Sequence, residues 1–456
     1  MKILILNGSP KGQKSVSLFY TSYLMNQFKD IEFQVFHISK SINKIIKDKD
    51  CFNEIIDEVS KCDGIIWAFP VYVLSVPAQL IQFIEHVRKQ KKINVFQNKY
   101  ACSVSTSMHF FDQTAHDYIQ AISEDFKLNY VDGFSAEMFD LKKEETRRNL
   151  KLFAENYFSY IKKRKPVYRK YQSLEEVNID HESDQPYSSG SVKETNVKVI
   201  VITNADKNDH SLNNMIQVFV SSLQKQILVI NVNDLDMKGG CLGCLKCSRE
   251  GKCIYKDEFI EYKEVIHNAR AFVYAFKINE RSFVCLWKMF MDRNFSNGHR
   301  IKDAFNSGFM ISGSLRKHSN IQAIVEGIVQ GGRAGFEGNL VTDEDGPEVY
   351  VPLIQAFASN LDRAIDANYR KPANFYGVGA HKIFRDLVYS TKGFQVEDHK
   401  YYKKQGLYDF PNRDYKMRLT NSIFRLLTMS SSGKKKLNAK INDMMLMTLQ
   451  KEIEKD

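Results

Sequence analysis

The sequence lacks the long apolar segments that a membrane-spanning helix requires. No uninterrupted apolar run reaches about 18 residues, the usual lower limit for crossing a bilayer. The pattern of a secretory signal is also missing, because Met1 is followed by an apolar strand pattern instead of a basic segment and an apolar core. These absences predict a cytoplasmic protein with no membrane partner.

A disulfide framework is absent as well. Four of the eight cysteines lie within one short loop, and the other four are scattered singly at Cys51, Cys62, Cys102 and Cys285. A disulfide framework would instead show paired cysteines throughout a small secreted domain. The observed pattern predicts a metal site in a reducing compartment.

The low hydrophobic content that indicates a disordered chain is not found either. Of the 456 residues, 43% are hydrophobic and 26% are charged, which predicts a globular protein large enough for two domains. The net charge of +11 suits an acidic protein partner, a phosphorylated cofactor or nucleic acid. Charge alone does not choose among these partners.

Apolar segments alternate with amphipathic helical patterns along most of the chain, and this alternation predicts parallel sheets covered by helices on both faces. Five strands are expected in the first half, at 2–7, 31–38, 63–69, 99–105 and 129–136. Five more are expected in the second half, at 197–203, 227–232, 270–277, 307–312 and 338–342. The predicted fold class is α/β: two flavodoxin-like, doubly wound, parallel five-stranded sheets in tandem, followed by a mostly helical C-terminal tail.

Composition divides the chain into four parts. Residues 1–165 form a first α/β domain, and residues 197–370 repeat its pattern, which indicates an internal duplication. Residues 166–196 are polar and lack periodicity, as a linker does. Residues 371–456 form a C-terminal extension, with a final helix expected near 434–454.

The C-terminal extension combines aromatic and basic side chains. This combination suits single-stranded nucleic acid, but no OB-type or RNA-recognition strand pattern accompanies it, so nucleic acid is not the partner we expect. We favour a tail that packs across the two halves, either as a structural clasp or as a lid. Candidate lid or pocket residues are His381, Arg385, His399, Tyr401 and Tyr402.

The segment NGSPKGQKSVS, residues 7–17, connects the first expected strand to the first expected helix. A loop at this place presents free backbone N–H groups and the positive end of a helix dipole, and both attract a phosphate. Gly8 and Gly12 permit tight turns, and further donors are Ser9, Lys11, Ser15 and Ser17. Neither a Walker loop nor a Gly-x-Gly-x-x-Gly turn is present. The segment is predicted to bind an anion, and an ordinary serine-capped loop is the alternative.

Two further loops are expected at the same edge of the sheet, because the carboxyl ends of parallel strands meet there. The third strand ends at Pro70-Val71-Tyr72-Val73, where backbone N–H groups could reach the polar edge of a flavin ring and Tyr72 supplies an aromatic wall. The fourth strand ends at Ser105-Thr106-Ser107-Met108-His109. His109 is the better candidate for a flavin contact or a proton donor, whereas His116 is interpreted as a helix-surface residue.

NGSPKGQKSVS together with FPVYVLSVPAQLIQFIEHV resembles the NADPH-dependent FMN reductase and iron–sulfur flavoprotein families of the flavodoxin-like fold, over roughly residues 1–165. The resemblance implies that the first loop binds the FMN phosphate, through Ser9, Lys11, Ser15 and Ser17, and that the second lies along the ring, at Pro70, Val71, Tyr72 and Val73. Because the three loops converge on one cleft, Gly12 and the third-loop residues Ser105, Thr106, Ser107 and His109 are also expected to contact the cofactor. Tyr72 and His109 are the expected catalytic residues. The third helix carries Glu85-His86 where family members commonly read Asp-Arg.

The second half contains GGCLGCLKCSREGKCIYKDEF, a C-x2-C-x2-C-x5-C arrangement. Four thiolates in one loop suit a cubane iron–sulfur cluster. Zinc usually takes its four ligands from two pairs of residues that lie farther apart in the sequence. A third alternative is that the four thiols bind no metal. The motif resembles that of iron–sulfur flavoproteins, where it binds [4Fe–4S]. This resemblance favours a cluster on Cys241, Cys244, Cys247 and Cys253.

The first loop of the second half, ITNADKNDHSLNN, places Asp206 and Asp209 where a phosphate would lie, and carboxylates repel a dianion. We therefore expect no flavin in this half. The segment LWKMFMDRN, with Asp292-Arg293, resembles the helix that pairs subunits in flavodoxin-like dimers, so we interpret the duplication as a fused pseudo-dimer. The Cys241–Cys253 loop should then face the flavin cleft of the first half, within about 15 Å of the ring.

The expected function is an FMN-dependent oxidoreductase that takes hydride from NAD(P)H and reduces a small-molecule acceptor such as a quinone, azo, nitro or other conjugated compound, with the [4Fe–4S] cluster as an electron relay. The alternative is a non-catalytic electron carrier that exchanges electrons with ferredoxin, whose acidic surface suits the net charge. Bleaching of the flavin by NAD(P)H would favour the enzyme. Both interpretations allow a homodimer.

Overall fold

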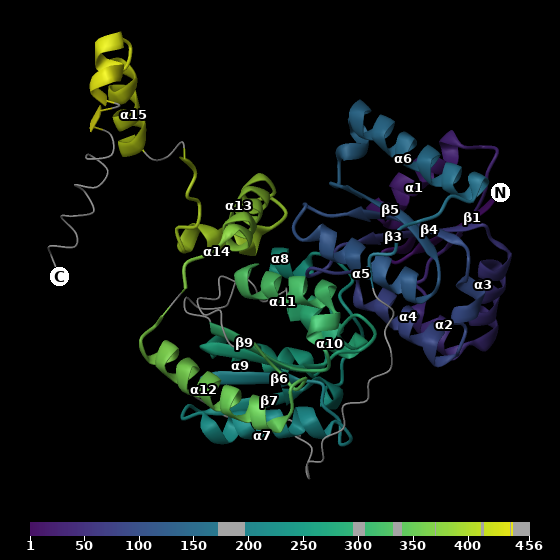
Figure 1. Cartoon of the computed structure of the whole chain (residues 1–456), viewed down its shortest axis with the longest axis horizontal. Helices are drawn as coiled ribbons and strands as arrows, with labels where there is room; N and C mark the ends of the chain where they lie inside the picture. The colour runs from purple at the N-terminus through teal and green to yellow at the C-terminus, as the bar shows by residue number, and fades with distance from the viewer. Residues whose placement is uncertain are drawn as a thin grey trace. The chain divides into compact units, whose positions relative to one another are not determined.

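The computed structural model describes residues 1–171, 197–294, 306–331, 340–369, 371–411, 415–437 and 439–440. The chain forms two compact units, Met1–Tyr401 and Tyr402–Asp456. The first unit contains both α/β halves, which run from purple to green in Figure 1. Most of the expected linker lies outside the described residues. In the described part of the chain, no helix is both long enough and apolar enough to cross a membrane.

The first half is built on a parallel five-stranded sheet whose strands lie in the order β2-β1-β3-β4-β5. This is the strand order of flavodoxin-like folds, so the predicted fold class is confirmed for this half. All five expected strands are present, at β1 (Lys2–Asn7), β2 (Glu32–Phe36), β3 (Gly64–Pro70), β4 (Tyr100–Thr106) and β5 (Asn129–Ala136).

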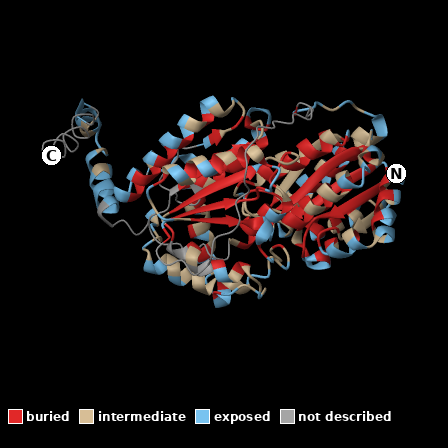
Figure 2. Cartoon of the chain, turned by 90° about the horizontal axis from the view of Figure 1, so that it is seen from below, coloured by how far each residue is buried: buried red, intermediate tan, exposed pale blue. Residues whose placement is uncertain are grey.

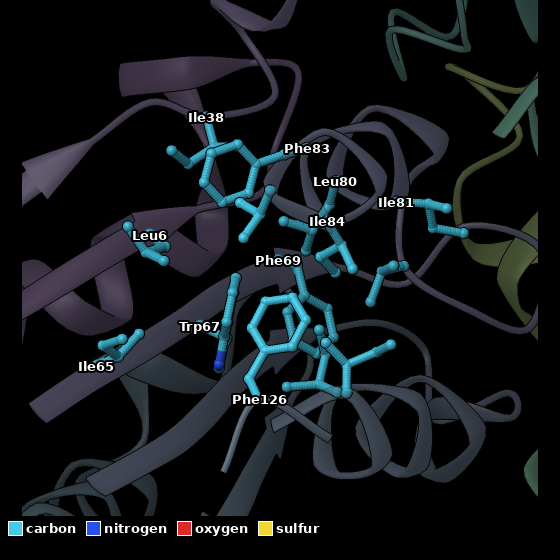
Figure 3. Close-up of a cluster of buried hydrophobic side chains, with 14 of the residues drawn as sticks. Leu6, Ile38, Ile65, Trp67, Phe69, Leu80, Ile81, Phe83, Ile84 and Phe126 are labelled. Atoms are coloured by element: carbon cyan, nitrogen blue, oxygen red, sulfur yellow. The ribbon is translucent and has the colours of Figure 1, made fainter. Parts of the chain in front are cut away.

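Helices cover both faces of this sheet (Figure 1). They are α1 (Val16–Gln27), α2 (Ile42–Lys47), α3 (Lys49–Lys61), α4 (Ala78–Lys89), α5 (Asp112–Asp125) and α6 (Glu144–Lys163). Because side chains alternate along a strand, Leu4 and Leu6 of β1 pack with α3, α4 and α5, whereas Ile3 and Ile5 pack with α1 and α6. Figure 3 shows part of the first cluster, in which Trp67 lies near side chains of α4. Burial of both faces explains the nearly continuous apolar strands of the sequence.

The second half repeats this topology, because its strands lie in the order β10-β9-β8-β6-β7. Read from the other edge, this is again second, first, third, fourth and fifth strand, as a duplication requires. The strands are β6 (Val199–Thr203), β7 (Ile227–Asn231), β8 (Ala271–Lys277), β9 (Asn306–Ser312) and β10 (Leu340–Thr342). Figure 2 shows that buried residues concentrate in the strands of both sheets.

The helices of the second half also form two layers. α7 and α12 share one apolar cluster, and α9, α10 and α11 share another on the opposite face. A short helix, α8, lies in the cysteine-rich segment and was not expected from the sequence. The bounds are α7 (His210–Ser222), α8 (Lys246–Glu250), α9 (Phe259–Asn268), α10 (Cys285–Asn294), α11 (Ser319–Gly331) and α12 (Pro347–Asp366).

The two halves share a buried interface centred on α4 and α10, which pack against each other. Leu74 and Phe111 of the first half belong to an apolar cluster of the second, and Cys285 and Met289 belong to a cluster of the first. α10, which carries LWKMFMDRN, therefore lies at the contact between the halves. Its resemblance to a subunit-pairing helix predicted this position.

The C-terminal extension is helical over α13 (Phe375–Ser390), α14 (Val396–Lys404) and α15 (Tyr415–Leu427). In the first unit, the ring of Phe384 lies 5.0 Å from that of Phe110, and the ring of Tyr376 lies 5.3 Å from that of Phe111. α13 also packs on α11. This helix therefore contacts both halves. The final helix expected near 434–454 lies mostly outside the described residues.

Candidate functional site

The loop after β1 is held in shape by Asn7, the last residue of that strand. Its amide nitrogen donates to the carbonyl of Gly12 at 3.0 Å, and its Oδ1 accepts from the backbone N–H of Ser9 at 3.1 Å. Gly12 has a φ of 57°, in the left-handed region that favours glycine. Sequence reasoning missed Asn7, although its place between the strand and Gly8 was a usable signal.

The serines predicted to bind phosphate lie at the N-terminus of α1. Ser9, Ser15 and Ser17 are buried, and the hydroxyl oxygens of Ser15 and Ser17 lie 2.8 Å apart. Ser15 is the residue before the helix, and within the described residues its side chain makes no capping bond to the first turn. Lys11 is exposed nearby. Hydroxyl groups beside uncapped helical N–H groups fit an anion such as a phosphate.

The loop after β3 ends in a tight turn. Tyr72 and Ser75 exchange backbone hydrogen bonds of 2.8 and 3.1 Å, and φ is 39° at Val73 and 64° at Leu74. Such values are costly for residues other than glycine, and above all for a β-branched valine. The N–H of Val71 donates to the carbonyl of Thr106 at 3.1 Å, so this loop adjoins the loop after β4.

The loop after β4 carries His109 as an exposed side chain. Its Nδ1 lies 2.8 Å from Oδ2 of Asp112, which also accepts a hydrogen bond from the Ser135 hydroxyl. Burial alone would raise the pKa of the Asp112 carboxyl, but the hydrogen bonds from Ser135 and His109 outweigh burial and lower that pKa. Because the ionised carboxylate only accepts, Nδ1 of His109 carries the proton and Nε2 is the nitrogen that can exchange one.

His116 is not a helix-surface residue, so that interpretation was wrong. Its ring turns toward the sheet, with Nδ1 2.6 Å from Oγ of Ser103 and Nε2 2.8 Å from Oγ of Ser105. Gly133 on β5 makes room for this ring, because a side chain there would collide with it. Burial lowers the pKa of His116 to about 4. The imidazole is therefore neutral at pH 7.

These groups form one chain of hydrogen bonds. The Ser105 hydroxyl, bonded to His116, donates to Oγ of Ser135 at 3.3 Å, and Ser135 donates to Asp112. The chain therefore runs from the buried His116 to the carboxylate that holds His109. It fixes the Asp112 carboxylate, and through it the tautomer of His109.

The cysteine loop lies between β7 and α9 and winds back on itself. Gly243, Leu245 and Gly251 have φ values of 61°, 57° and 66°, all in the left-handed region. The glycines adopt this conformation at little cost. The N–H of Gly243 also donates to the sulfur of Cys241 at 3.4 Å.

Arg293 of α10 lies beside the last cysteine. Its guanidinium donates to Sγ of Cys253 at 3.9 Å and to the carboxylate of Asp257 at 2.6 and 2.7 Å. The side chain is only 1% exposed, and it stacks over the rings of Tyr255 and Phe259. The guanidinium therefore places a positive charge beside a thiol that could serve as a metal ligand. Sequence reasoning assigned Arg293 only to subunit pairing and missed this contact.

The thiols lie close enough to influence one another. Burial, and to a lesser extent neighbouring Cys247 and Cys244, raise the pKa of Cys241 to about 12, and burial also raises the pKa of Cys247. In the described part of the chain, no three His, Cys, Asp or Glu side chains are gathered in a metal-holding group. The donor set, four thiols of one glycine-rich loop beside a cation, fits an iron–sulfur cluster.

The cysteine loop lies directly against the loops of the first half. A side chain on Gly243 would collide with the Tyr72 hydroxyl and approach Cε of Lys11 to 3.2 Å. The amide nitrogen of Gln79, at the start of α4, donates to the carbonyl of Cys241 at 3.3 Å. Burial, followed by the charge of Cys241, raises the pKa of the Tyr72 phenol. The cysteine loop therefore lies against the loops after β1 and β3 of the first half.

The equivalent first loop of the second half is closed by its own carboxylate. Oδ2 of Asp209 accepts from the N–H of Asp206 at 3.0 Å, and its Oδ1 accepts from Lys277 at 2.7 Å. A negatively charged group at this place is unfavourable for a phosphate. The geometry favours the interpretation that only the first half has a flavin site.

The strand order and the loops together define the first half as a flavodoxin-like domain, in which the loop after β1 places buried serine hydroxyls beside the N-terminus of α1. Residues 1–143 match the family model described as NADPH-dependent FMN reductase. This match makes the first half similar to the NADPH-dependent FMN reductases.

Known proteins similar to the chain include an iron–sulfur flavoprotein of Archaeoglobus fulgidus, 23% identical over 175 residues, which are 36% of this chain and 78% of that protein. An FMN-dependent NADH-azoreductase from Bacillus anthracis is 13% identical, with a TM-score of 0.27 over 34% of this chain and 99% of that one. A flavoenzyme NAD(P)H:(acceptor) oxidoreductase from Paracoccus denitrificans is 15% identical, with a TM-score of 0.29 over 36% of this chain and 97% of that one. Structural likeness at this level does not bear on function.

Proposed function

We propose that the protein is an FMN-dependent NAD(P)H oxidoreductase that passes electrons between FMN in its first half and a [4Fe–4S] cluster on the cysteine loop of its second half, and that it reduces a small conjugated acceptor. The contact of Gly243 with Lys11 and Tyr72 carries the proposal, because it sets the cysteine loop beside two of the expected flavin loops. The family match of residues 1–143 and the likeness to an iron–sulfur flavoprotein support it.

Each loop has a role in this proposal. FMN, when bound, would accept a hydride from NAD(P)H and release electrons singly or in pairs. The Ser9, Ser15 and Ser17 hydroxyls and the N-terminus of α1 would hold its phosphate. The Pro70–Val73 loop would lie along the ring, and Nε2 of His109 would exchange a proton with the acceptor.

On the cysteine loop, the four thiols would hold the cluster. Loading would release their protons, since metal binds thiolates, and Arg293 would offset part of the negative charge that results.

A second candidate is an electron carrier that exchanges electrons with ferredoxin. The likeness to the iron–sulfur flavoprotein of Archaeoglobus fulgidus and the net charge of +11 favour this function. The two functions differ in their electron donor. Rapid bleaching of the bound flavin by NAD(P)H identifies the enzyme, whereas reduction by ferredoxin or dithionite alone identifies the carrier.

The test is the cofactor content of protein purified without oxygen and reconstituted with iron and sulfide. Ser9→Ala combined with Lys11→Glu should release FMN and leave the iron content unchanged. Cys247→Ala should remove the iron and the broad absorbance near about 400 nm while FMN remains. The matched control is Cys51→Ala, because Cys51 lies outside the cysteine loop, and this variant should keep both FMN and iron. Wild-type protein without iron would refute the relay, and wild-type protein without FMN would refute the proposal as a whole.

A further inference from the structure

The two halves carry the same tight turn after their third strands. In the first half, Tyr72 and Ser75 close the turn with a pair of backbone hydrogen bonds. In the second half, Asn279 and Ser282 do the same, with both bonds at 2.9 Å. The two residues between them have positive φ in both turns. The turns are therefore structural equivalents.

The helices that follow these turns are equivalent residue by residue, because α4 begins at Ala78 and α10 at Cys285, at the same spacing after each turn. A carboxylate at the same later position of each helix caps the other helix. Oδ2 of Asp292 accepts from the N–H of Ala78 at 3.1 Å, and Oε1 of Glu85 accepts from the N–H of Cys285 at 3.0 Å. The interface between the halves is symmetric in these contacts.

One position breaks this symmetry. Lys288 of α10 is 0% exposed, donates to the carbonyl of Tyr72 at 2.8 Å and pairs with Asp292. Its equivalent on α4 is Ile81, which is also buried. The interface thus accepts an aliphatic side chain at this place in one helix and has a lysine in the other.

Burial of a lysine is unfavourable unless the ammonium group is well paired, and an apolar side chain of similar size is often as stable or more so. Ile81 shows that the fold itself does not require a cation here. The lysine is also directed at one atom, the carbonyl of Tyr72, in the half that keeps the anion-binding loop. The second half, whose first loop is closed by Asp209, has no equivalent contact: in the described structure, α4 has no lysine at the matching position.

Burial lowers the pKa of the Lys288 ammonium, and the adjacent Asp292 opposes this effect. Burial raises the pKa of Asp292 to about 6. Charged or neutral, the Lys288 nitrogen retains hydrogens with which to donate to Tyr72. The contact with the turn is therefore kept in either protonation state.

We propose that Lys288 is a positioning residue by which the second half holds the Tyr72 carbonyl and fixes the Pro70–Val73 loop in the shape that receives the flavin ring. The inference rests on the FMN site proposed above. It gives the second half a part in flavin binding that does not depend on the cluster.

The experiment compares full-length double variants that remove the buried charge pair but keep an acceptor for Ala78. Lys288→Gln with Asp292→Asn keeps a neutral donor, and Lys288→Met with Asp292→Asn removes it. Ile81→Met is the matched control at the equivalent position. We would measure FMN affinity, the visible circular dichroism of bound FMN, and the unfolding free energy of each apoprotein in urea.

Loss of the donor to the Tyr72 carbonyl should weaken FMN binding about 10- to 100-fold in the Met variant. The Gln side chain is shorter than lysine and uncharged, so its weaker hydrogen bond should reduce the affinity about 3- to 10-fold. The dichroism of the bound flavin should change in the Met variant, which a merely structural role would not cause, and Ile81→Met should match the wild type in both readouts.

The inference is overturned if the Met variant folds and binds FMN with wild-type affinity and dichroism. Should the Met variant not fold, the Gln variant decides, and unchanged affinity and dichroism there would overturn it. Wild-type protein that binds no FMN would instead refute the proposed function itself, so the two failures are distinguishable.

Discussion

At the scale of single residues, His116 links burial to pH dependence. Burial in the folded protein keeps the imidazole neutral and lowers its pKa to about 4, whereas the ordinary pKa of histidine is 6.5. The unfolded chain therefore takes up a proton more readily than the folded chain. Stability attributable to His116 is fully present above pH 6.5 and is lost as the pH falls from 6.5 through 4. Glu85 and Glu280 act in the opposite direction, because burial raises the pKa of each to about 7.

We predict that His116→Gln removes this part of the acid sensitivity. Between pH 7 and pH 5 the wild type should lose about 2 kcal/mol more unfolding free energy than the variant, as linkage requires for such a depressed pKa. Urea unfolding at both pH values measures the difference, and the opposing effect of Glu85 and Glu280 cancels because both proteins contain them. Equal losses in the two proteins would contradict the assignment.

At the scale of elements, α4 and α10 are held together by reciprocal caps. Glu85 accepts from the N–H of Cys285 and, at 3.2 Å, from the side chain of Asn279. We predict that Glu85→Ala lowers the unfolding free energy by about 1–3 kcal/mol, because it leaves buried donors without an acceptor. Glu85→Gln keeps an acceptor and should cost much less.

The control for this prediction is Glu54→Ala, on the exposed side of α3, which should change the unfolding free energy by less than about 0.5 kcal/mol. Urea titrations of the three variants at pH 7 decide. If Glu85→Ala lowers the unfolding free energy no more than Glu54→Ala does, the Glu85 cap contributes nothing to stability.

At the scale of the first unit, the halves behave as one packed body. Leu74 extends the apolar core of the second half, and Arg281 of the second half, 0% exposed, donates to Asp125 of the first at 3.1 and 2.9 Å. Neither half can keep these groups buried alone. We therefore expect the halves to unfold in a single cooperative transition.

The two tryptophans, Trp67 and Trp287, test this expectation, because one lies in each half and both are 0% exposed. In Trp67→Phe and Trp287→Phe variants, the remaining tryptophan reports on the half that contains it. The urea transitions of the two variants, followed by fluorescence and by far-ultraviolet circular dichroism, should coincide once corrected for the small stability change of each substitution. A fluorescence transition that separates from the dichroism transition would show that the halves unfold independently.

The predictions that succeeded from sequence depend on local patterns. Strand alternation and helical periodicity identify which segments form strands or helices and which of their faces are buried, because both patterns repeat within a few residues. The turn chemistry of Gly12 and the spacing of Cys241 to Cys253 are local in the same sense. The sequence by itself therefore determined two tandem parallel sheets, the serine-rich loop after the first strand and a four-cysteine loop in the second half.

Tertiary structure alone decided which distant groups meet. His116 turns its ring toward the sheet because Gly133, on a neighbouring strand, leaves room for it. Tyr72 meets Gly243 and Lys288 because α4 packs on α10 at one register, and that register is set by the interlocking of many side chains from both helices. No periodic pattern records such a contact, since periodicity shows which face of an element is buried and not what it is buried against.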